Sequence, residues 1–369
     1  MTFATTLQSR FDARSNNFDL IRLVAAVTVV YGHAYSLAGD AAKPVDPLST
    51  LMALGYIGTL AVAVFFVLSG FLVARSVERS SLQGYLMARA LRILPALALV
   101  TAMEAFVLGP CFFEGNVGWY LLHVAPGHLR NVLVFGEEPW IAGVFTHNPV
   151  PVVNGALWSL PIEALFYLVL PFLLLLASGR RWVVLALWLA TLAAEPAVGW
   201  YGLSDSTPGA VVFNEVRVFQ AIHMGGYYLA GVVAWLYRDR VPWDRGVFLS
   251  ALLLLFAVRG GVAAPLVLKL CLPYAVLWIG LAGGAGSRLK AGIGDLSYGV
   301  YLFGFPVLGT MVALGRQVLP PEAVFAFALP ATVGLAAMSW HLVESPALRL
   351  RHWLRRRDAA RVSLDTSAA

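Results

Sequence analysis

The sequence predicts an all-α protein, a polytopic bundle of about ten transmembrane helices with both termini in the cytoplasm. Hydrophobic residues make up 59% of the 369-residue chain and charged residues only 12%, with a mean hydropathy of +0.76. Soluble domains carry charges at about a quarter of their positions, because their surfaces face water. So few charges cannot cover a chain of this length, and its apolar residues must therefore face lipid.

Apolar runs of about 20 residues, the length needed to cross a bilayer, define the predicted spans. They cover residues 19–38, 51–74, 93–110, 153–177, 182–200, 216–237, 246–259, 262–284, 294–315 and 322–343. The seventh run is short, and the turn that follows it at residues 259–261 can shift by several positions. The first run begins with Asp19 and lacks a small-residue cleavage pattern, which favours a retained helix over a signal peptide.

The distribution of basic residues predicts the orientation of these spans. With the N-terminus inside, 19 of the 26 Lys and Arg residues fall on the cytoplasmic side and 4 on the outer side. This asymmetry is the positive-inside pattern of a multi-pass protein of the inner (plasma) membrane. It also accounts for the net charge of +6 without a nucleic-acid partner, because the basic residues separate apolar segments instead of forming one patch.

This topology divides the chain into three segments: a cytoplasmic N-terminal segment at 1–18, a transmembrane domain at 19–345 and a basic cytoplasmic tail at 346–369. The tail is expected to contact anionic membrane lipids.

Cys111 and Cys271 lie in different predicted environments, which disfavours both a disulfide framework and a thiolate metal site. His123 and His128, five apart in a loop, are a weak metal-ligand pair. We therefore expect chemistry without a metal ion.

Arg22 and His33 are ionisable groups inside the first span, where each is costly unless it faces a protein interior or an aqueous cavity. Eleven residues make about three helical turns, so both project from one face, roughly 16 Å apart along the axis. An arginine at the cytoplasmic mouth could hold a phosphate, and a neutral imidazole nearer the outer leaflet could take a proton from a hydroxyl. The alternative is a histidine bonded to a neighbouring helix and an arginine that snorkels toward the cytoplasm.

Arg89 and Arg92 stand three apart at the start of the third predicted span. At this spacing both point the same way, which suits a polyanion such as the phosphates of a nucleotide-bearing donor. Ordinary positive-inside anchoring is the alternative.

Glu163 lies about ten residues into the fourth span, at a depth comparable to that of His33. Its carboxylate could orient the imidazole or polarise an acceptor, and pairing with a buried arginine is the alternative. Ser69 and Gly70, inside the second span, are expected to allow close helix packing.

Several short motifs occur in an order that resembles a known family. They are Asn17-Phe18-Asp19-Leu20-Ile21-Arg22 with His33, Phe65-Phe66-Val67-Leu68-Ser69-Gly70-Phe71, Arg89-x-x-Arg92-x-x-Pro95, Trp158-Ser159-Leu160-x-x-Glu163-x-x-Phe166-Tyr167, Asp295-Leu296-Ser297-Tyr298-Gly299-Val300-Tyr301-Leu302, and Glu344-x-Pro346. This series resembles the acyltransferase-3 family of integral-membrane acyltransferases over roughly residues 15 to 350.

The resemblance implies an enzyme that moves an acyl group, commonly acetyl from cytoplasmic acetyl-CoA, to a hydroxyl of an extracytoplasmic glycan or lipid-linked sugar. It implies that His33 is the catalytic residue and Arg22 its partner. It assigns Arg89 and Arg92 to donor binding and Glu163 to the site. Acetyl-CoA would serve as a co-substrate, and membrane lipids and the acceptor glycan would be the partners.

One position departs from the family pattern. Family members often carry a histidine after the Tyr-Leu of the ninth-span motif, and here Gly304 stands at that position. Either the histidine is dispensable, or the acceptor and gating details differ in this protein.

Two rival functions stay open from the sequence. A transporter or flippase for a glycan or lipid-linked precursor would also carry intramembrane charges, although no clear inverted repeat supports it. An acyltransferase with a small-molecule acceptor is the second rival. The oligomeric state is open as well, with a homodimer among the options.

Overall fold

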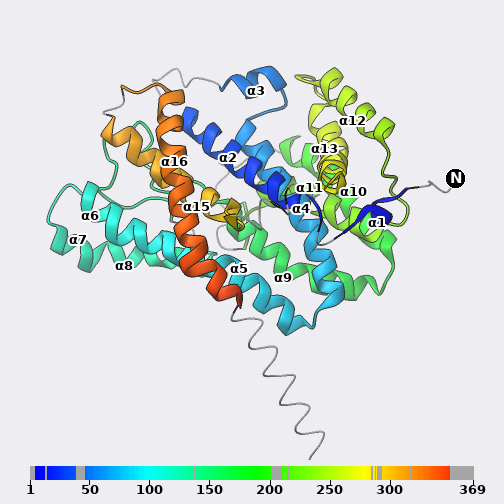
Figure 1. Ribbon diagram of the computed structural model, residues 1–369, viewed down its shortest axis with the longest axis horizontal. Helices are drawn as coiled ribbons and strands as arrows, with labels where there is room; N and C mark the ends of the chain where they lie inside the picture. The colour runs from blue at the N-terminus through cyan, green and yellow to red at the C-terminus, as the bar shows by residue number, and fades with distance from the viewer. Residues whose placement is uncertain are drawn as a thin grey trace, which may run out of the picture.

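The computed structural model describes residues 5–12, 15–38, 46–136, 138–200, 210–213, 216–283, 286, 288, 293–315 and 318–349. Within these ranges the chain is mostly helical, as the sequence predicts (Figure 1). The helices that fall on the ten predicted spans are α2 (Phe18–Leu37), α4 (Ile57–Arg79), α5 (Leu82–Met103), α9 (Ser159–Ala177), α10 (Arg181–Trp200), α11 (Val218–Leu236), α12 (Arg245–Val258), α13 (Ala264–Leu281), α15 (Ser297–Leu314) and α16 (Pro321–Ser339).

Seven helical segments in the described part of the chain are long and apolar enough to cross a membrane, which makes this a multi-pass membrane protein. They contain α2, α4, α5, α9, α13, α15 and α16. Helix α12 is apolar but shorter. Helix α11 carries polar side chains in its first two turns, among them Gln220 and His223, which lower its hydropathy.

Helix α5 begins eleven residues earlier than the predicted 93–110 span. The side chain of Ser81 caps its N-terminus by accepting a hydrogen bond from the backbone N–H of Gly84. Arg89 and Arg92 therefore lie inside the helix rather than at its start. The predicted range followed the uninterrupted apolar run, and Arg89 and Arg92 break that run nearer the N-terminus of the helix.

Helices α4 and α11 pack closely at the centre of the bundle, with α2 beside α4 and α15 beside α2 (Figure 1). Two glycines allow the close contact between α4 and α11. A Cβ on Gly70 would lie 1.9 Å from the carbonyl oxygen of Tyr228, and one on Gly231 would lie 2.2 Å from that of Val67. The predicted packing role of the Ser69-Gly70 pair is confirmed for the glycine.

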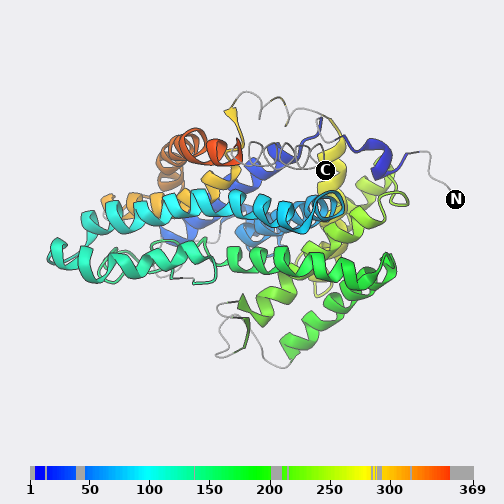
Figure 2. The same cartoon turned by 90° about the horizontal axis from the view of Figure 1, so that it is seen from below.

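Short helices extend from one side of the bundle, after a π-helical turn that continues α5 (Figures 1 and 2). These elements are η1 (Glu104–Leu108), α6 (Gly109–Phe112), α7 (Val117–His123), α8 (Ala125–His128) and η2 (Leu129–Leu133). A buried contact between Glu104 and His128 holds the segment to the bundle, with 2.9 Å between Oε2 and Nε2. Asn154 donates a 2.6 Å hydrogen bond to the same carboxylate.

The remaining elements are small. They are α1 (Leu7–Arg10), α3 (Pro47–Met52), the π-helical turn η3 (Trp340–Glu344), and the antiparallel pair β1 (Val211–Phe213) and β2 (Val216–Arg217), in which Val211 faces Arg217 and Phe213 faces Val216. The basic tail beyond residue 349 lies outside the described residues, as do Arg14, Lys43, Lys290 and Arg316.

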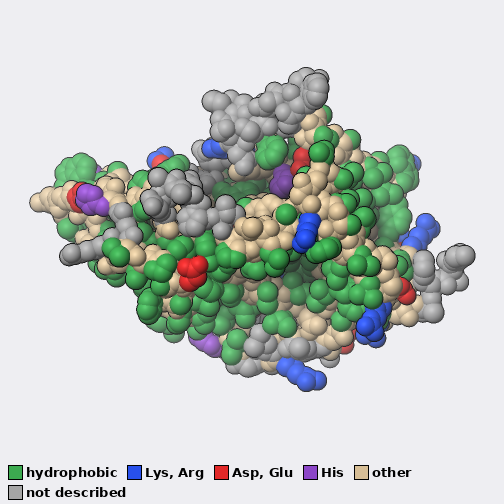
Figure 3. Space-filling model, turned by 90° about the horizontal axis from the view of Figure 1, so that it is seen from above, with side chains coloured by type: hydrophobic (Ala, Val, Ile, Leu, Met, Phe, Trp, Pro, Cys, Tyr) green, Lys and Arg blue, Asp and Glu red, His purple; other side chains and the backbone are tan. Residues whose placement is uncertain are grey.

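Hydrophobic side chains cover much of the face shown in Figure 3, and charged ones are few. Large apolar residues are exposed on several helices, including Leu176 at 80% and Phe256 at 62%. Such a surface fits contact with lipid, where it needs no polar cover.

Candidate active site

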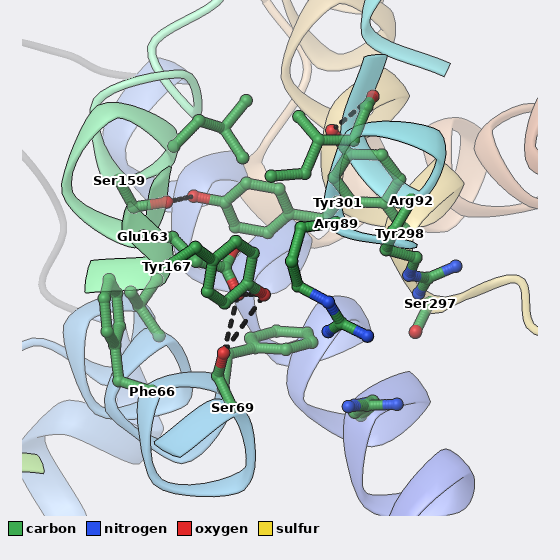
Figure 4. A pocket seen from close by; sticks show the side chains of 15 residues that line it. Phe66, Ser69, Arg89, Arg92, Ser159, Glu163, Tyr167, Ser297, Tyr298 and Tyr301 are labelled. Carbon is green, nitrogen blue, oxygen red and sulfur yellow. Dashed lines mark hydrogen bonds between the residues drawn. The ribbon is translucent and has the colours of Figure 1, made fainter. Parts of the chain in front are cut away.

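A cavity at the centre of the bundle contains four of the five residues that the sequence singled out (Figure 4). This central cavity holds about 700 Å³, including the part open to solvent. Its walls come from α2, α4, α5, α9 and α15. The lining residues used below are Arg22, Ser69, Arg89, Arg92, Glu163, Tyr167, Tyr298 and Tyr301.

Glu163 is held at the cavity wall by two hydroxyl groups. Ser69 of α4 donates a 3.0 Å hydrogen bond to Oε1, and Tyr167, one turn further along α9, donates to the same oxygen. The hydroxyl oxygens of Ser69 and Tyr167 lie 3.1 Å apart, which closes a three-membered network. The carboxylate therefore binds neighbours on α4 and α9, while His33 of α2 has other neighbours.

Arg92 is locked between two acidic side chains. Its guanidinium lies 2.9 Å from Asp295 and 3.7 Å from Glu344, and both carboxylates are almost completely buried. The ring of Tyr298 lies under it at 5.3 Å. Arg92 thus ties α5 to the segment just before α15 and to the turn η3 that follows α16.

Arg89 lies one turn before Arg92 but is differently placed. Its guanidinium carbon lies 5.4 Å from the ring centre of Tyr167 (Figure 4), and its Nε is buried without a hydrogen-bond partner among the described residues. No acid of the described chain lies within 4.0 Å of it. Its charge is therefore available to an anion in the cavity.

A second pocket, the arginine basin, opens beside the central cavity and shares Arg22, Arg89 and Arg92 with it. It adds Arg75 and Arg79 from the last turns of α4, and it encloses about 1190 Å³ including its open part. Arg22 pairs with Asp19 at 3.5 Å. Arg75, Arg79 and Arg89 have no acidic partner among the described residues, so the basin carries a marked excess of positive charge.

His33 stands outside both pockets, eleven residues along α2 from Arg22 and so roughly 16 Å away along the axis. Its Nδ1 is 3.4 Å from the Tyr56 hydroxyl, and its ring lies 5.0 Å from that of Phe305. Gly32 lets Tyr56 approach, because a Cβ there would lie 2.9 Å from the Tyr56 oxygen. In the structure, Arg22 lies at the two pockets, and His33 lies toward the other end of the same helix.

Gly304, at the position where family members often carry a histidine, faces α2. A Cβ there would lie 2.4 Å from Cγ2 of Val30. A larger residue at 304 would therefore require the Val30 side chain, or α15 and α2 themselves, to shift.

Several polar residues of the cavity were not singled out from the sequence as site residues. Ser69 was assigned to packing and Tyr167 only to a motif, although Glu163 and Tyr167 are four apart and share one helix face. Arg75 and Arg79, which line the arginine basin, are among the 19 basic residues that the sequence assigns to the cytoplasmic side. The sequence signal for Ser69 is a hydroxyl group in the middle of a mostly apolar span. In the described ranges, no cluster of three or more His, Cys, Asp and Glu side chains is placed to hold a metal ion.

Comparison with known proteins gives consistent matches over most of the chain. A family model described as an acyltransferase domain (Acyl_transf_3) matches residues 15–341. Nodulation protein 10 of Rhizobium leguminosarum bv. viciae is 30% identical over 366 residues, which cover 91% of this chain and 94% of that protein. An O-acetyl transferase of Shigella phage Sf6 is 25% identical over 364 residues, 95% of this chain and 99% of that protein.

A third relative, acyltransferase MdmB of Streptomyces mycarofaciens, is 28% identical over 340 residues, 82% of this chain and 84% of that protein. No solved structure matches the chain. Because the family model and the relatives cover nearly the whole sequence, the chain belongs to the acyltransferase-3 family and is a membrane O-acyltransferase.

Proposed function

We propose that this protein takes an acyl group, most simply acetyl, from acyl-CoA on the cytoplasmic side. It transfers the group to a hydroxyl of an extracytoplasmic glycan or glycolipid. The relative from phage Sf6 is named an O-acetyl transferase, which supports acetyl as the group transferred. Membership of an acyltransferase family favours group transfer over the transporter alternative.

The observation that carries this proposal is the arginine basin. Coenzyme A bears three phosphate groups, and guanidinium groups bind phosphate through paired, charge-assisted hydrogen bonds. Arg75, Arg79 and Arg89 offer three unpaired charges at the mouth of a cavity that continues into the bundle. A donor held there by its phosphates can extend its acyl end along α2 toward His33.

The proposed reaction follows from this placement. His33 takes the proton of the acceptor hydroxyl as its oxygen attacks the thioester carbonyl. The C–S bond then breaks, the acyl group stays on the acceptor oxygen, and the CoA thiolate recovers the proton. Arg22 supports the donor at the other end of α2. Glu163, fixed by Ser69 and Tyr167, shapes the cavity wall next to Arg89.

The proposal includes a topology with ten spans in the inner membrane and both termini in the cytoplasm. Helices α10, α11 and α12 are the three additional spans, and they fall on predicted ranges. Arg75, Arg79 and Arg89 then share the cytoplasmic side with Arg238, which pairs with Glu78 at 3.7 Å. The basin would open toward the compartment that contains acyl-CoA.

The test is acetyl transfer from radiolabelled acetyl-CoA in membranes that contain the protein and its endogenous acceptors. An Arg89→Gln variant should raise the KM for acetyl-CoA about 10- to 100-fold, the effect of losing one charged hydrogen-bonding partner. Arg180→Gln, an exposed arginine outside both pockets, is the matched control. An unchanged donor KM in Arg89→Gln, or label that never enters glycan or lipid-linked sugar, would contradict the proposal.

A further inference from the structure

A third pocket lies away from the five residues discussed above. This aromatic pocket is lined by Thr59, Trp158, Phe219, Gln220, His223 and Met224 and encloses about 810 Å³ including its open part. It forms where the first turn of α4 meets the N-terminal ends of α9 and α11.

The aromatic pocket and the arginine basin lie at opposite ends of α4. Thr59 lines the first and Ser76 the second, and seventeen helical residues separate them by roughly 25 Å. Thr59, Val62 and Phe66 follow one face of α4 at helical spacing, and the last two line the central cavity. The aromatic pocket therefore continues the line of the central cavity, away from the donor end.

Its walls combine aromatic faces with polar groups that have no hydrogen-bond partner in the described part of the chain. The half-buried side chains of Thr59, Trp158 and Gln220 supply a hydroxyl, an indole N–H and an amide. Trp158 and Phe219 supply flat apolar surfaces. Unpaired polar groups of this kind are costly at membrane depth unless a ligand or water satisfies them.

The charges behind the pocket balance one another. Glu195 of α10 pairs with Lys269 of α13, which is 2% exposed, and its Oε1 lies 2.9 Å from Nδ1 of His223. Lys269 also approaches the same Nδ1 at 3.3 Å. The charges of the Glu195 carboxylate and the Lys269 ammonium group cancel, so the cluster does not favour an anionic ligand. The contacts of both groups with Nδ1 orient His223 in the pocket wall.

We infer that the aromatic pocket binds an uncharged pyranose ring of the acceptor. A pyranose has apolar C–H faces that pack on indole and phenyl rings, and hydroxyls that both donate and accept hydrogen bonds. That pattern matches Trp158 and Phe219 together with Thr59 and Gln220, and small-ligand sites are commonly built in this way. The inference rests on the proposed function, because it assigns the acceptor to the end of the bundle opposite the donor.

The experiment uses the full chain in nanodiscs and a charged thiosulfonate reagent whose attachment is measured cysteine by cysteine by peptide mass spectrometry. Thr59→Cys is the reporter, since it is close to isosteric. The native Cys111 is exposed, lines none of the three pockets and is the internal control. The probes are methyl pyranosides of glucose, galactose, rhamnose and N-acetylglucosamine.

At least one methyl pyranoside should slow labelling of the reporter, about tenfold when its concentration is ten times its Kd, and leave Cys111 unchanged. Phe219→Ala in the reporter background should weaken this protection, whereas Phe327→Ala, on an exposed face of α16, should not. Gln220→Cys replaces the reporter if Thr59→Cys does not fold.

A second arm separates this inference from the proposed function. In Ser76→Cys, which lines the arginine basin, acetyl-CoA should slow labelling and the methyl pyranosides should not. Loss of that acetyl-CoA effect would contradict the donor proposal alone. Three results would contradict the assignment of the aromatic pocket to a sugar. They are no protection of the reporters by any pyranoside, protection by decanoate instead, and protection that Phe219→Ala leaves intact.

Discussion

Arg89 and Arg92 illustrate how two residues with the same sequence signal acquire different tasks. Their spacing of three predicts one shared face and one shared ligand, and both do line the central cavity. Arg92, however, neutralises Asp295 and Glu344, whereas Arg89 has no acidic partner among the described residues. We therefore expect Arg92 to serve stability first and Arg89 to serve the donor.

This difference predicts unequal losses of stability when each arginine is replaced. Arg92→Gln leaves two nearly buried carboxylates without their cation, and breaking a buried pair costs about 3–5 kcal/mol. Thermal unfolding in detergent should show a large fall in Tm for Arg92→Gln and little change for Arg89→Gln. Equal Tm values for the two variants would contradict the assignment.

A second prediction for a single residue concerns His33. His33→Ala should lower acyl transfer about 10²- to 10⁴-fold, the usual contribution of a general base. Because His33 lies away from both donor pockets, binding of acetyl-CoA should stay within error of the unmodified protein. The measurements are single-turnover transfer and equilibrium donor binding. Normal transfer by a folded, inserted His33→Ala protein would remove His33 from the mechanism.

Contacts between helices decide what the motif glycines do. Gly304 sits against Val30, so that α15 and α2 approach closely, and α2 carries both Arg22 and His33. The position of His33 relative to the cavity therefore depends on this contact. In this chain the glycine at 304 allows that close approach.

Enlarging residue 304 should separate α15 from α2. Gly304→Val should destabilise the protein by about 1–3 kcal/mol through overpacking. Val30→Ala makes room and should restore part of the loss, giving a favourable coupling energy in a double-mutant cycle. The measurement is the shift in unfolding midpoint for both single variants and the double variant. Strictly additive effects would show that the two positions do not meet.

At the scale of the whole molecule, the proposed topology places the two ends of α4 on opposite sides of the membrane. In intact cells, an impermeant thiol reagent should label the native Cys111, which is exposed on α6. It should not label Ser178→Cys, in the turn between α9 and α10, until the membrane is made permeable. The reverse pattern would invert the topology and move the arginine basin to the outer side.

The sequence by itself determined the class of protein, the approximate ranges of its long helices and four of the residues that line the cavity. Composition alone requires a lipid-facing surface, and the 3.6-residue period places Arg22 and His33 on one face of one helix. Four of the five predicted site residues line one cavity because their motifs fall on helices that meet at the centre. These are consequences of local rules, which short stretches of sequence obey.

Only the tertiary structure decided which charges pair. Arg92 meets Asp295 and Glu344, and His223 meets Glu195 and Lys269, across helices that are distant in sequence. Such pairs depend on how far each helix is rotated about its axis and where it crosses its neighbours. Those quantities are set by the packing of many small contacts, such as Gly70 on Tyr228, and have no local signature in the chain.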